Sequence, residues 1–242
     1  MRARKILRLS GADTRDFLQG LITNDINKID QGLVYAALLT PQGKYLSDFF
    51  LSAAAEDVLL DVDAEQAEAL LKRLSMYRLR AKVEITATDL QVKQGTGAAP
   101  QGAFADPRHA DLGWRLIGTE AGDDGSDWDA LYVAHCVPQS GIELGPDSYI
   151  LEAGFEALNG VDFRKGCYVG QEVTARMKHK TELRKGLRRV EINGTAPVGC
   201  DIIANGKIAG TLFTQAAGQA IAYLRLDRAK GEMHADDAEI KL

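Results

Sequence analysis

Residues 165–172 read Lys165-Gly166-Cys167-Tyr168-Val169-Gly170-Gln171-Glu172. Two glycines bracket the cysteine and permit backbone conformations that other residues avoid, and a helix is predicted from Gln171 to Lys178. A cysteine just before a helix faces the positive end of the helix dipole, and Arg164 and Lys165 add positive charge nearby. Both effects favour the thiolate, whereas Glu172 opposes them if it faces the sulfur. The segment indicates a reactive or ligand-handling cysteine, with a small buried cysteine in a turn as the alternative.

The bulk composition is that of a globular chain with one large domain or two modest ones. The 242 residues are 45% hydrophobic and 26% charged, an ordinary balance. The formal net charge of −5 argues against general affinity for nucleic acid or anionic membranes. There is neither a signal-peptide pattern nor an apolar run of roughly 20 residues that would cross a bilayer. Three scattered cysteines without a CxxC pair favour a reducing compartment, so we expect a cytoplasmic protein. Nothing in the sequence demands an oligomer, so we expect a monomer.

The first two thirds of the chain alternate strand and helix patterns, which predicts an α+β unit. The apolar spacing and the turn residues predict a helix between Ser10 and Gly20, strands at 33–39 and 45–51 around a turn, a strand at 57–62, a helix at 64–76, a strand at 82–87 and a helix at 128–137.

The composition changes after about Thr181. Short β-like runs at 189–192, 200–204 and 219–226 alternate with turn residues such as Asn-Gly, a pattern that predicts a small barrel or sandwich. We predict an α/β part at residues 1–182, with a subdomain inserted at about 45–100, and a C-terminal β-barrel at 183–242.

The octapeptide at 165–172 resembles the signature of the YgfZ family of tetrahydrofolate-binding proteins, which is related to the glycine cleavage T-protein, an aminomethyltransferase. Two other parts of the chain resemble the same superfamily. The first is an N-terminal pattern made of Phe17-Leu18-Gln19-Gly20, Thr23-Asn24-Asp25, Leu39-Thr40-Pro41-Gln42-Gly43-Lys44 and Asp48. The second is Leu151-Glu152-Ala153-Gly154. The resemblance spans most of the chain and implies a T-protein-like fold, with an internally divided α/β folate-binding part followed by a small β-barrel.

The resemblance also implies a function: tetrahydrofolate binding and the maturation or repair of iron–sulfur proteins, with Cys167 as the working thiol. The implied partners are folate and iron–sulfur client or assembly proteins. A folate-dependent aminomethyltransferase is the alternative, but Ser47 stands where T-protein relatives carry an acid before Asp48, which weakens it. A third hypothesis is a noncatalytic scaffold that docks a partner through the basic segment 176–189.

Two carboxylates are candidate readers of the pterin, because its edge presents N–H donors that a carboxylate accepts in pairs. They are Glu152, otherwise a helix-surface glutamate, and Asp48, otherwise a polar residue on the solvent face of a strand. Lys165 and Arg176 are expected to meet the glutamate tail of folate or to set the charge around Cys167, unless they are simply solvated. The remaining candidate folate contacts, from the signature, are Gly166, Tyr168, Gly170, Gln171 and Glu172. Tyr168 would stack on a ring of the ligand, and its alternative is packing in the core.

Metal ligands of the chain's own are not expected. The four histidines share no ligand spacing, and an iron–sulfur cluster at Cys167 would need thiolates from another chain. The basic segment suggests an anionic contact, either polyglutamylated folate or a partner protein, or else an exposed hinge. It carries Arg176, Lys178, Lys180, Arg184, Lys185, Arg188 and Arg189 against Glu182 alone.

Overall fold

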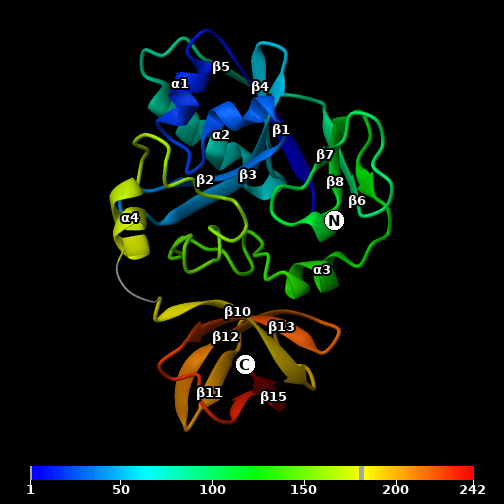
Figure 1. The fold of residues 1–242 in the computed structure, drawn as a ribbon, viewed down its shortest axis with the longest axis vertical. Coiled ribbons are helices and arrows are strands. Elements are labelled where there is room, and N and C mark those ends of the chain that lie inside the picture. Colours follow the sequence, from blue (N-terminus) through cyan, green and yellow to red (C-terminus); the bar gives the residue numbers. More distant parts are fainter. Residues whose placement is uncertain (1, 180–182) are drawn as a thin grey trace. The chain divides into compact units, whose positions relative to one another are not determined.

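The computed structural model describes residues 2–179 and 183–242, which form two compact units (Figure 1). The first unit comprises Met1–Ser126 and Glu156–Val173, and the second comprises Asp127–Phe155 and Thr174–Leu242. Helices and strands are mixed, as predicted. No helix in the described part of the chain combines the length and the apolarity that a membrane span requires. The domain boundaries predicted from the sequence stay predictions.

The first unit is built on an antiparallel sheet with the strand order β2-β3-β4-β1-β5. Its strands are β1 Arg4–Ser10, β2 Val34–Leu39, β3 Tyr45–Ala54, β4 Asp57–Asp63 and β5 Glu84–Ala87. The predicted hairpin and the two further strands are confirmed. The helix predicted from Ser10 is wrong at its start, because Ser10 pairs with Glu84 as the last residue of β1.

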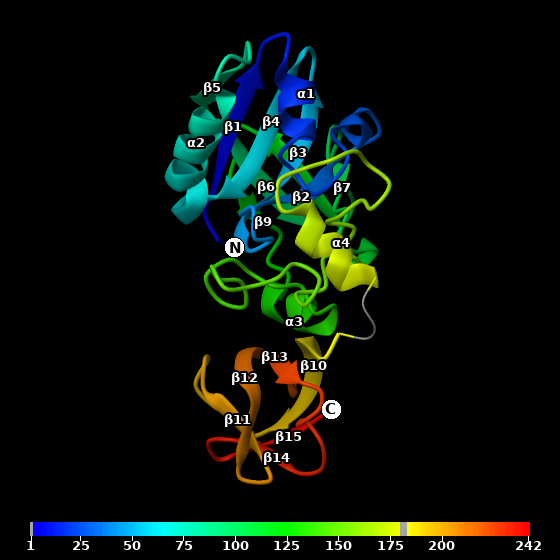
Figure 2. The same cartoon turned by 90° about the vertical axis from the view of Figure 1, so that its left-hand side faces the viewer.

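Three helices cover one face of this sheet: α1 Thr14–Gln19, the 3₁₀ helix η1 Ile26–Asp30 and α2 Ala64–Arg78. Figure 2 shows α1 and α2 on that side of the sheet. In α2, Ala67, Leu70 and Leu74 are buried at helical spacing, and the Asp63 side chain caps the helix by accepting from the Glu65 backbone N–H.

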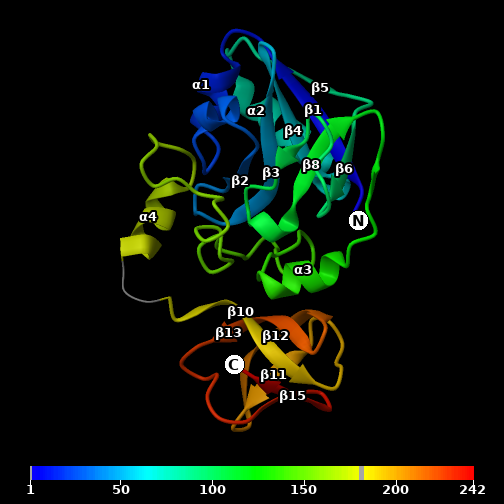
Figure 3. The ribbon, with the colours of Figure 1, turned by 45° about the vertical axis from the view of Figure 1, so that its right-hand side comes forward.

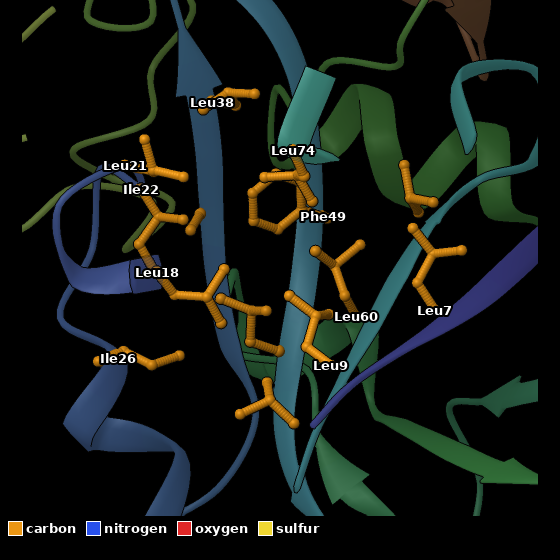
Figure 4. Packing of buried hydrophobic residues seen from close by; sticks show 14 of the residues in the cluster. Leu7, Leu9, Leu18, Leu21, Ile22, Ile26, Leu38, Phe49, Leu60 and Leu74 are labelled. Atoms are coloured by element: carbon orange, nitrogen blue, oxygen red, sulfur yellow. The ribbon is translucent and has the colours of Figure 1, made fainter. Parts of the chain in front are cut away.

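The core lies between the helices and every second residue of the strands. Figure 4 shows side chains of the sheet, among them Phe49 and Leu60, together with Leu18 of α1 and Leu74 of α2 in one cluster. All four side chains are fully buried. Burial of this continuous apolar face is the main stabilising contribution that the first unit receives.

A second, four-stranded sheet belongs to the first unit on the opposite face (Figure 2), and the sequence did not predict it. Its strands are β6 Gln91–Gly95, β7 Phe104–Ala105, β8 Trp114–Gly118 and β9 Gly122–Asp123, with the 3₁₀ helix η2 Ala110–Leu112 before β8. The two sheets meet through charge: Arg115 Nη2 of β8 donates to Asp61 Oδ2 of β4 at 2.7 Å. Buried charges of this kind do not follow the apolar pattern that reveals a strand.

The second unit contains a closed barrel with the strand order β10-β13-β12-β11-β14-β15 (Figure 3). The strands are β10 Lys185–Asn193, β11 Asp201–Ala204, β12 Lys207–Ala216, β13 Gln219–Arg225, β14 Met233–Ala235 and β15 Ala238–Lys241. The predicted C-terminal barrel is confirmed. The helix α3 Trp128–Ala134 ends three residues before the predicted 137, and α4 Gln171–His179 agrees with the helix predicted after the signature.

Candidate functional site

Cys167 is exposed, four residues before α4 begins. Its two neighbours differ in exposure: Gly166 is exposed, and the Tyr168 side chain is buried. The loop therefore presents the thiol to solvent while the next side chain anchors the loop. The alternative of a cysteine buried in a turn is excluded.

Lys165 holds one end of this loop. Its Nζ donates to the backbone oxygens of Gln19 at 2.7 Å and Ile22 at 2.6 Å, and it lies 5.0 Å from the centre of the Tyr168 ring. Burial lowers the pKa of Lys165 to about 8, against the opposing effects of Asp25 and Asp162. The ammonium thus sits at the carbonyl end of α1, which favours a cation, and its hydrogen bonds join the signature to that helix.

Gly170 holds the other end. Its φ is +84°, and a Cβ there would lie 2.6 Å from the Thr40 backbone oxygen and 3.0 Å from the Leu39 Cβ. Gly43 approaches from the opposite side: its φ is +74°, and a Cβ there would lie 2.8 Å from the Val173 Cβ. Both positions need glycine, so the signature packs directly against the turn of the β2–β3 hairpin.

The chain just before the signature is tied to the segment after α1. Thr23 Oγ1 donates to the Gly160 backbone oxygen at 2.7 Å, and Asn24 Nδ2 donates to the Asn159 backbone oxygen at 2.7 Å. Lys28 forms an ion pair of 2.7 Å with Asp162. These contacts give a structural role to the matched segment Thr23-Asn24-Asp25. It holds the chain that leads into the signature, although more than a hundred residues separate the two segments in the sequence.

Asp48 lies on β3 and is 8% exposed, so it is not on the solvent face of a strand. Its carboxylate accepts from the hydroxyl groups of Tyr45 at 2.6 Å and Tyr35 at 3.0 Å. Burial, followed by the charge of Asp48, raises the pKa of Tyr35 well above its ordinary value. The Tyr35 phenol therefore remains a protonated donor, and the arrangement is a buried carboxylate that accepts hydrogen bonds from two phenols.

Ser47 points to the other side of β3, where its Oγ donates to Gln66 Oε1 of α2 at 2.8 Å. A cavity of about 280 Å³ opens there, lined by residues that include Ser47, Gln66 and Arg73. The Tyr45 hydroxyl also contacts Gln66, so it connects Asp48 with this cavity.

Glu152 belongs to the second unit and lies in a turn, not on the surface of a helix. Its Oε2 accepts from the Tyr223 hydroxyl of β13 at 2.6 Å, and its backbone oxygen accepts from the Leu187 N–H at 2.7 Å. Burial, followed by the hydrogen bond that the Tyr223 hydroxyl donates to Glu152, raises the pKa of Tyr223. The contacts of Glu152 therefore tie its segment to the barrel, and its part in a folate site together with Asp48 stays a prediction.

The other predicted contacts lie on or near α4. Gln171 is half-buried, while Glu172 and Arg176 are exposed. In the basic segment, Arg189 Nη1 donates to the Ala134 backbone oxygen at 2.8 Å. Lys180 and Glu182 lie outside the described residues. The roles of these side chains toward folate or a partner stay predictions.

Sequence reasoning missed Tyr35, Tyr45 and Gln66 around Asp48. Strand alternation and hairpin register could have revealed Tyr35. Ala37 pairs with Asp48 and Tyr35 with Phe50, so Tyr35 and Asp48 lie on the same face of the hairpin as near neighbours. Gln66 comes from α2, and a contact between a helix and a strand end has no such period to reveal it.

The fold and the signature loop together define a T-protein-like protein with a C-terminal barrel. The chain is similar to the glycine cleavage system aminomethyltransferase T from Bartonella henselae, with a TM-score of 0.76 over 98% of this chain and 81% of that one. At 15% identity, this likeness establishes the fold. Residues 184–242 match the family model of the CAF17 C-terminal beta-barrel domain.

The relatives identify the family. The mitochondrial iron–sulfur cluster assembly factor IBA57 of Mus musculus is 30% identical over 99% of this chain and 80% of its own length, and that of Homo sapiens is 30% identical over 96% and 78%. The homologue of Mycosarcoma maydis is 33% identical over 75% of this chain and 54% of its own. The chain belongs to the CAF17/IBA57 family of iron–sulfur cluster assembly factors, and the resemblance to YgfZ fits this family.

One expectation is overturned by these names. The scattered, unpaired cysteines led us to expect a cytoplasmic location, whereas the relatives from all three organisms are named mitochondrial. Scattered, unpaired cysteines are compatible with either location, so the cysteine pattern did not carry the distinction.

Proposed function

We propose that this chain binds tetrahydrofolate and supports the maturation or repair of iron–sulfur proteins, with Cys167 as its working thiol. The observation that carries the proposal is the placement of Cys167. Among the chain's three cysteines, all of them described, it alone is exposed. Burial raises the pKa of Cys136 to about 11 and raises the pKa of Cys200 as well, so those two are poor sources of thiolate.

The rigid mounting of the Cys167 loop supports this role. Lys165 and Gly170 fix the loop on either side, through hydrogen bonds to the end of α1 and close packing on the β2–β3 turn. A cysteine on a fixed loop loses little conformational entropy when its sulfur binds a metal. Iron–sulfur clusters are generally held by several thiolates. Cys167 would therefore act as one ligand, with the others supplied by a client or assembly protein.

The folate part of the proposal rests on Asp48. A buried carboxylate with two phenols suits the donor-rich edge of a reduced pterin, since carboxylate and hydroxyl oxygens accept N–H hydrogen bonds. When bound, tetrahydrofolate supplies a carrier of one-carbon units. In this chain, Asp48 would orient the pterin, and Tyr35 and Tyr45 would hold the carboxylate in place.

Calorimetric titration of tetrahydrofolate under reducing conditions tests the folate part. Wild type and Cys167→Ser should bind equally, whereas Asp48→Asn should weaken binding at least about tenfold, because it removes a charged acceptor. Glu68→Gln, which changes an exposed carboxylate on α2, is the matched control and should bind as wild type does. If none of the four proteins binds, the chain is not a folate protein.

The thiol part is tested in cells that lack their own relative of the family. We expect Cys136→Ser and Cys200→Ser to restore the activity of iron–sulfur enzymes and Cys167→Ser to leave it low. Full activity with Cys167→Ser would refute the proposed role of the thiol and favour a scaffold. The likeness to an aminomethyltransferase concerns the fold, and Ser47 is engaged with Gln66, so transferase activity has no separate support.

A further inference from the structure

The turn that ends α2 carries a leucine in a backbone conformation that suits glycine. Leu79 has φ +44° and ψ −103°, and the Ala81 N–H donates to the Arg78 backbone oxygen at 2.7 Å. This is the geometry of a type II′ turn with Leu79 at its second position, where glycine is strongly preferred. A strained residue that is held in place by no packing of its own calls for a functional explanation.

The same leucine is almost fully in solvent. Leu79 is 88% exposed, and Met76, three residues earlier in the last turn of α2, is 63% exposed. Both large apolar side chains are exposed at the C-terminal end of α2, and they are here called the apolar projection. Exposed large apolar side chains that lie close together along the chain occur at contact surfaces, and neither side chain contributes to the core of the first unit.

Positive charge surrounds this projection. Lys72 and Arg73 precede it on α2, Arg80 follows in the turn, and all three are exposed. Within the described part of the chain, none of the three forms an ion pair. Acidic residues near this part of the chain include Glu68, one turn before Lys72 on α2, Glu84 after the turn, and Asp13, whose Oδ2 accepts from the Lys82 backbone N–H. In a chain of net charge −5, this local excess of positive charge selects an acidic partner.

We propose that Lys72, Arg73, Met76, Leu79 and Arg80, here named the α2 tip, are a docking surface for a protein with an apolar pocket and an acidic rim. Leu79 and Met76 enter the pocket as anchors, and the three basic side chains pair with the rim. Protein hot spots have this arrangement, with a few buried anchors inside a charged border. Two apolar side chains bury too little surface to hold a protein on a membrane by themselves, so a protein pocket is the better match.

The decisive variant is Leu79→Gly, because glycine suits the turn. We expect it to keep or raise the thermal unfolding midpoint and to bind tetrahydrofolate as wild type does. In cells that lack their own relative, it should lower iron–sulfur enzyme activity several-fold, and Arg80→Glu should do the same. Val198→Ser, which changes another exposed apolar residue (59% exposed) far along the chain, should keep full activity.

A cross-linking measurement identifies the class of partner. Photoreactive benzoylphenylalanine in place of Met76, in the full chain in those cells, should give an adduct with an acidic protein, and Arg80→Glu in the same chain should abolish that adduct. An adduct with a second copy of this chain, or sedimentation of the protein with phosphatidylserine vesicles that Leu79→Gly prevents, would overturn the proposal. Full cellular activity of both Leu79→Gly and Arg80→Glu would also overturn it.

The inference rests on the proposed function only in its cellular readout. If the α2 tip is wrong, folate binding and the requirement for Cys167 remain. If the folate proposal is wrong, wild type fails to bind tetrahydrofolate while the cross-link and its loss with Arg80→Glu persist.

Discussion

Neighbouring side chains of the signature have opposite surroundings. Cys167 is in solvent, whereas Lys165 is 8% exposed and bound to two backbone oxygens. Lysine is rarely buried without partners, because removing its charge from water is costly. The two carbonyl groups near the end of α1 offset part of that cost. Lys165 therefore positions the loop, and in this conformation its ammonium group is committed to the protein's own backbone.

The buried position of Lys165 makes stability depend on pH. Burial holds its pKa at about 8 in the folded chain, against an ordinary value of 10.5. Between these two values the unfolded chain binds the proton more tightly, so the free energy of unfolding contributed by this group rises with pH. Wild type should therefore gain stability relative to Lys165→Met from about pH 8 upward, by at most about 1.4 kcal/mol per pH unit.

Urea unfolding of both proteins across this pH range measures the effect. The lost hydrogen bonds lower the free energy of unfolding of Lys165→Met by the same amount at every pH. The informative quantity is therefore how the difference in free energy of unfolding between the two proteins changes with pH. Lys241→Met, which changes an exposed lysine of the barrel, should run parallel to wild type. A constant difference between wild type and Lys165→Met would mean that the ammonium is solvated in the folded chain.

Among the elements, those with a clear period or clear turn residues could be predicted. The hairpin of β2 and β3, the helix α2 and the barrel all have them. The strand β1 was missed because Ser10 and Asp13 resemble a helix cap, although Leu7 and Leu9 alternate with Arg8. The sheet of β6 to β9 was missed because its contacts to the first sheet are made by buried charges such as Arg115. The surroundings of Asp48 depend on α2 and on register, which a single sequence does not reveal.

The contact between the signature and the β2–β3 turn depends on glycine. Gly170→Ala would place a Cβ 2.6 Å from the Thr40 oxygen at a φ of +84°, so we expect a loss of about 1–3 kcal/mol in the free energy of unfolding. Gly166→Ala is the matched control, since a Cβ there meets nothing within 4 Å. Urea unfolding compares them, and equal stability of the two variants would show that the loop does not pack on the turn.

The two sheets of the first unit are joined by Asp61. It is 1% exposed and accepts from Arg4 Nε at 2.6 Å and from Arg115 Nη2 at 2.7 Å. Burial alone would raise the pKa of Asp61, but the two arginines together lower it. Asp61→Asn leaves two guanidinium groups without their anion and should cost about 3–5 kcal/mol at neutral pH.

The pH dependence follows from the same shift. A lowered pKa in the folded chain means that the stability from Asp61 is present above the ordinary carboxyl pKa and is lost as the pH falls toward the folded value. The difference between wild type and Asp61→Asn should therefore shrink in acid. Asp30→Asn breaks an exposed pair with Arg15 and should change stability little. Equal effects of the two substitutions would refute a buried bridge between the sheets.

At the scale of the whole molecule, each compact unit has its own core. Leu60 belongs to the cluster of the first unit and Leu212 to the barrel cluster of the second, and both are fully buried. A unit with its own core can unfold as its own cooperative step. The family relationship is seen in both units, because the signature lies at the end of the first and the matched barrel domain lies in the second.

We therefore predict two unfolding transitions that respond to different substitutions. Leu60→Ala and Leu212→Ala should each cost about 2–5 kcal/mol, and each should move one transition. The two tryptophans report separately, since Trp114 belongs to the first unit and Trp128 to the second. In the Trp128→Phe background only Trp114 remains, and its fluorescence transition should shift when Leu60→Ala is added. In the Trp114→Phe background only Trp128 remains, and its transition should shift when Leu212→Ala is added. One shared transition, moved equally by both leucine substitutions and by both reporters, would mean that the two cores unfold as a single cooperative unit.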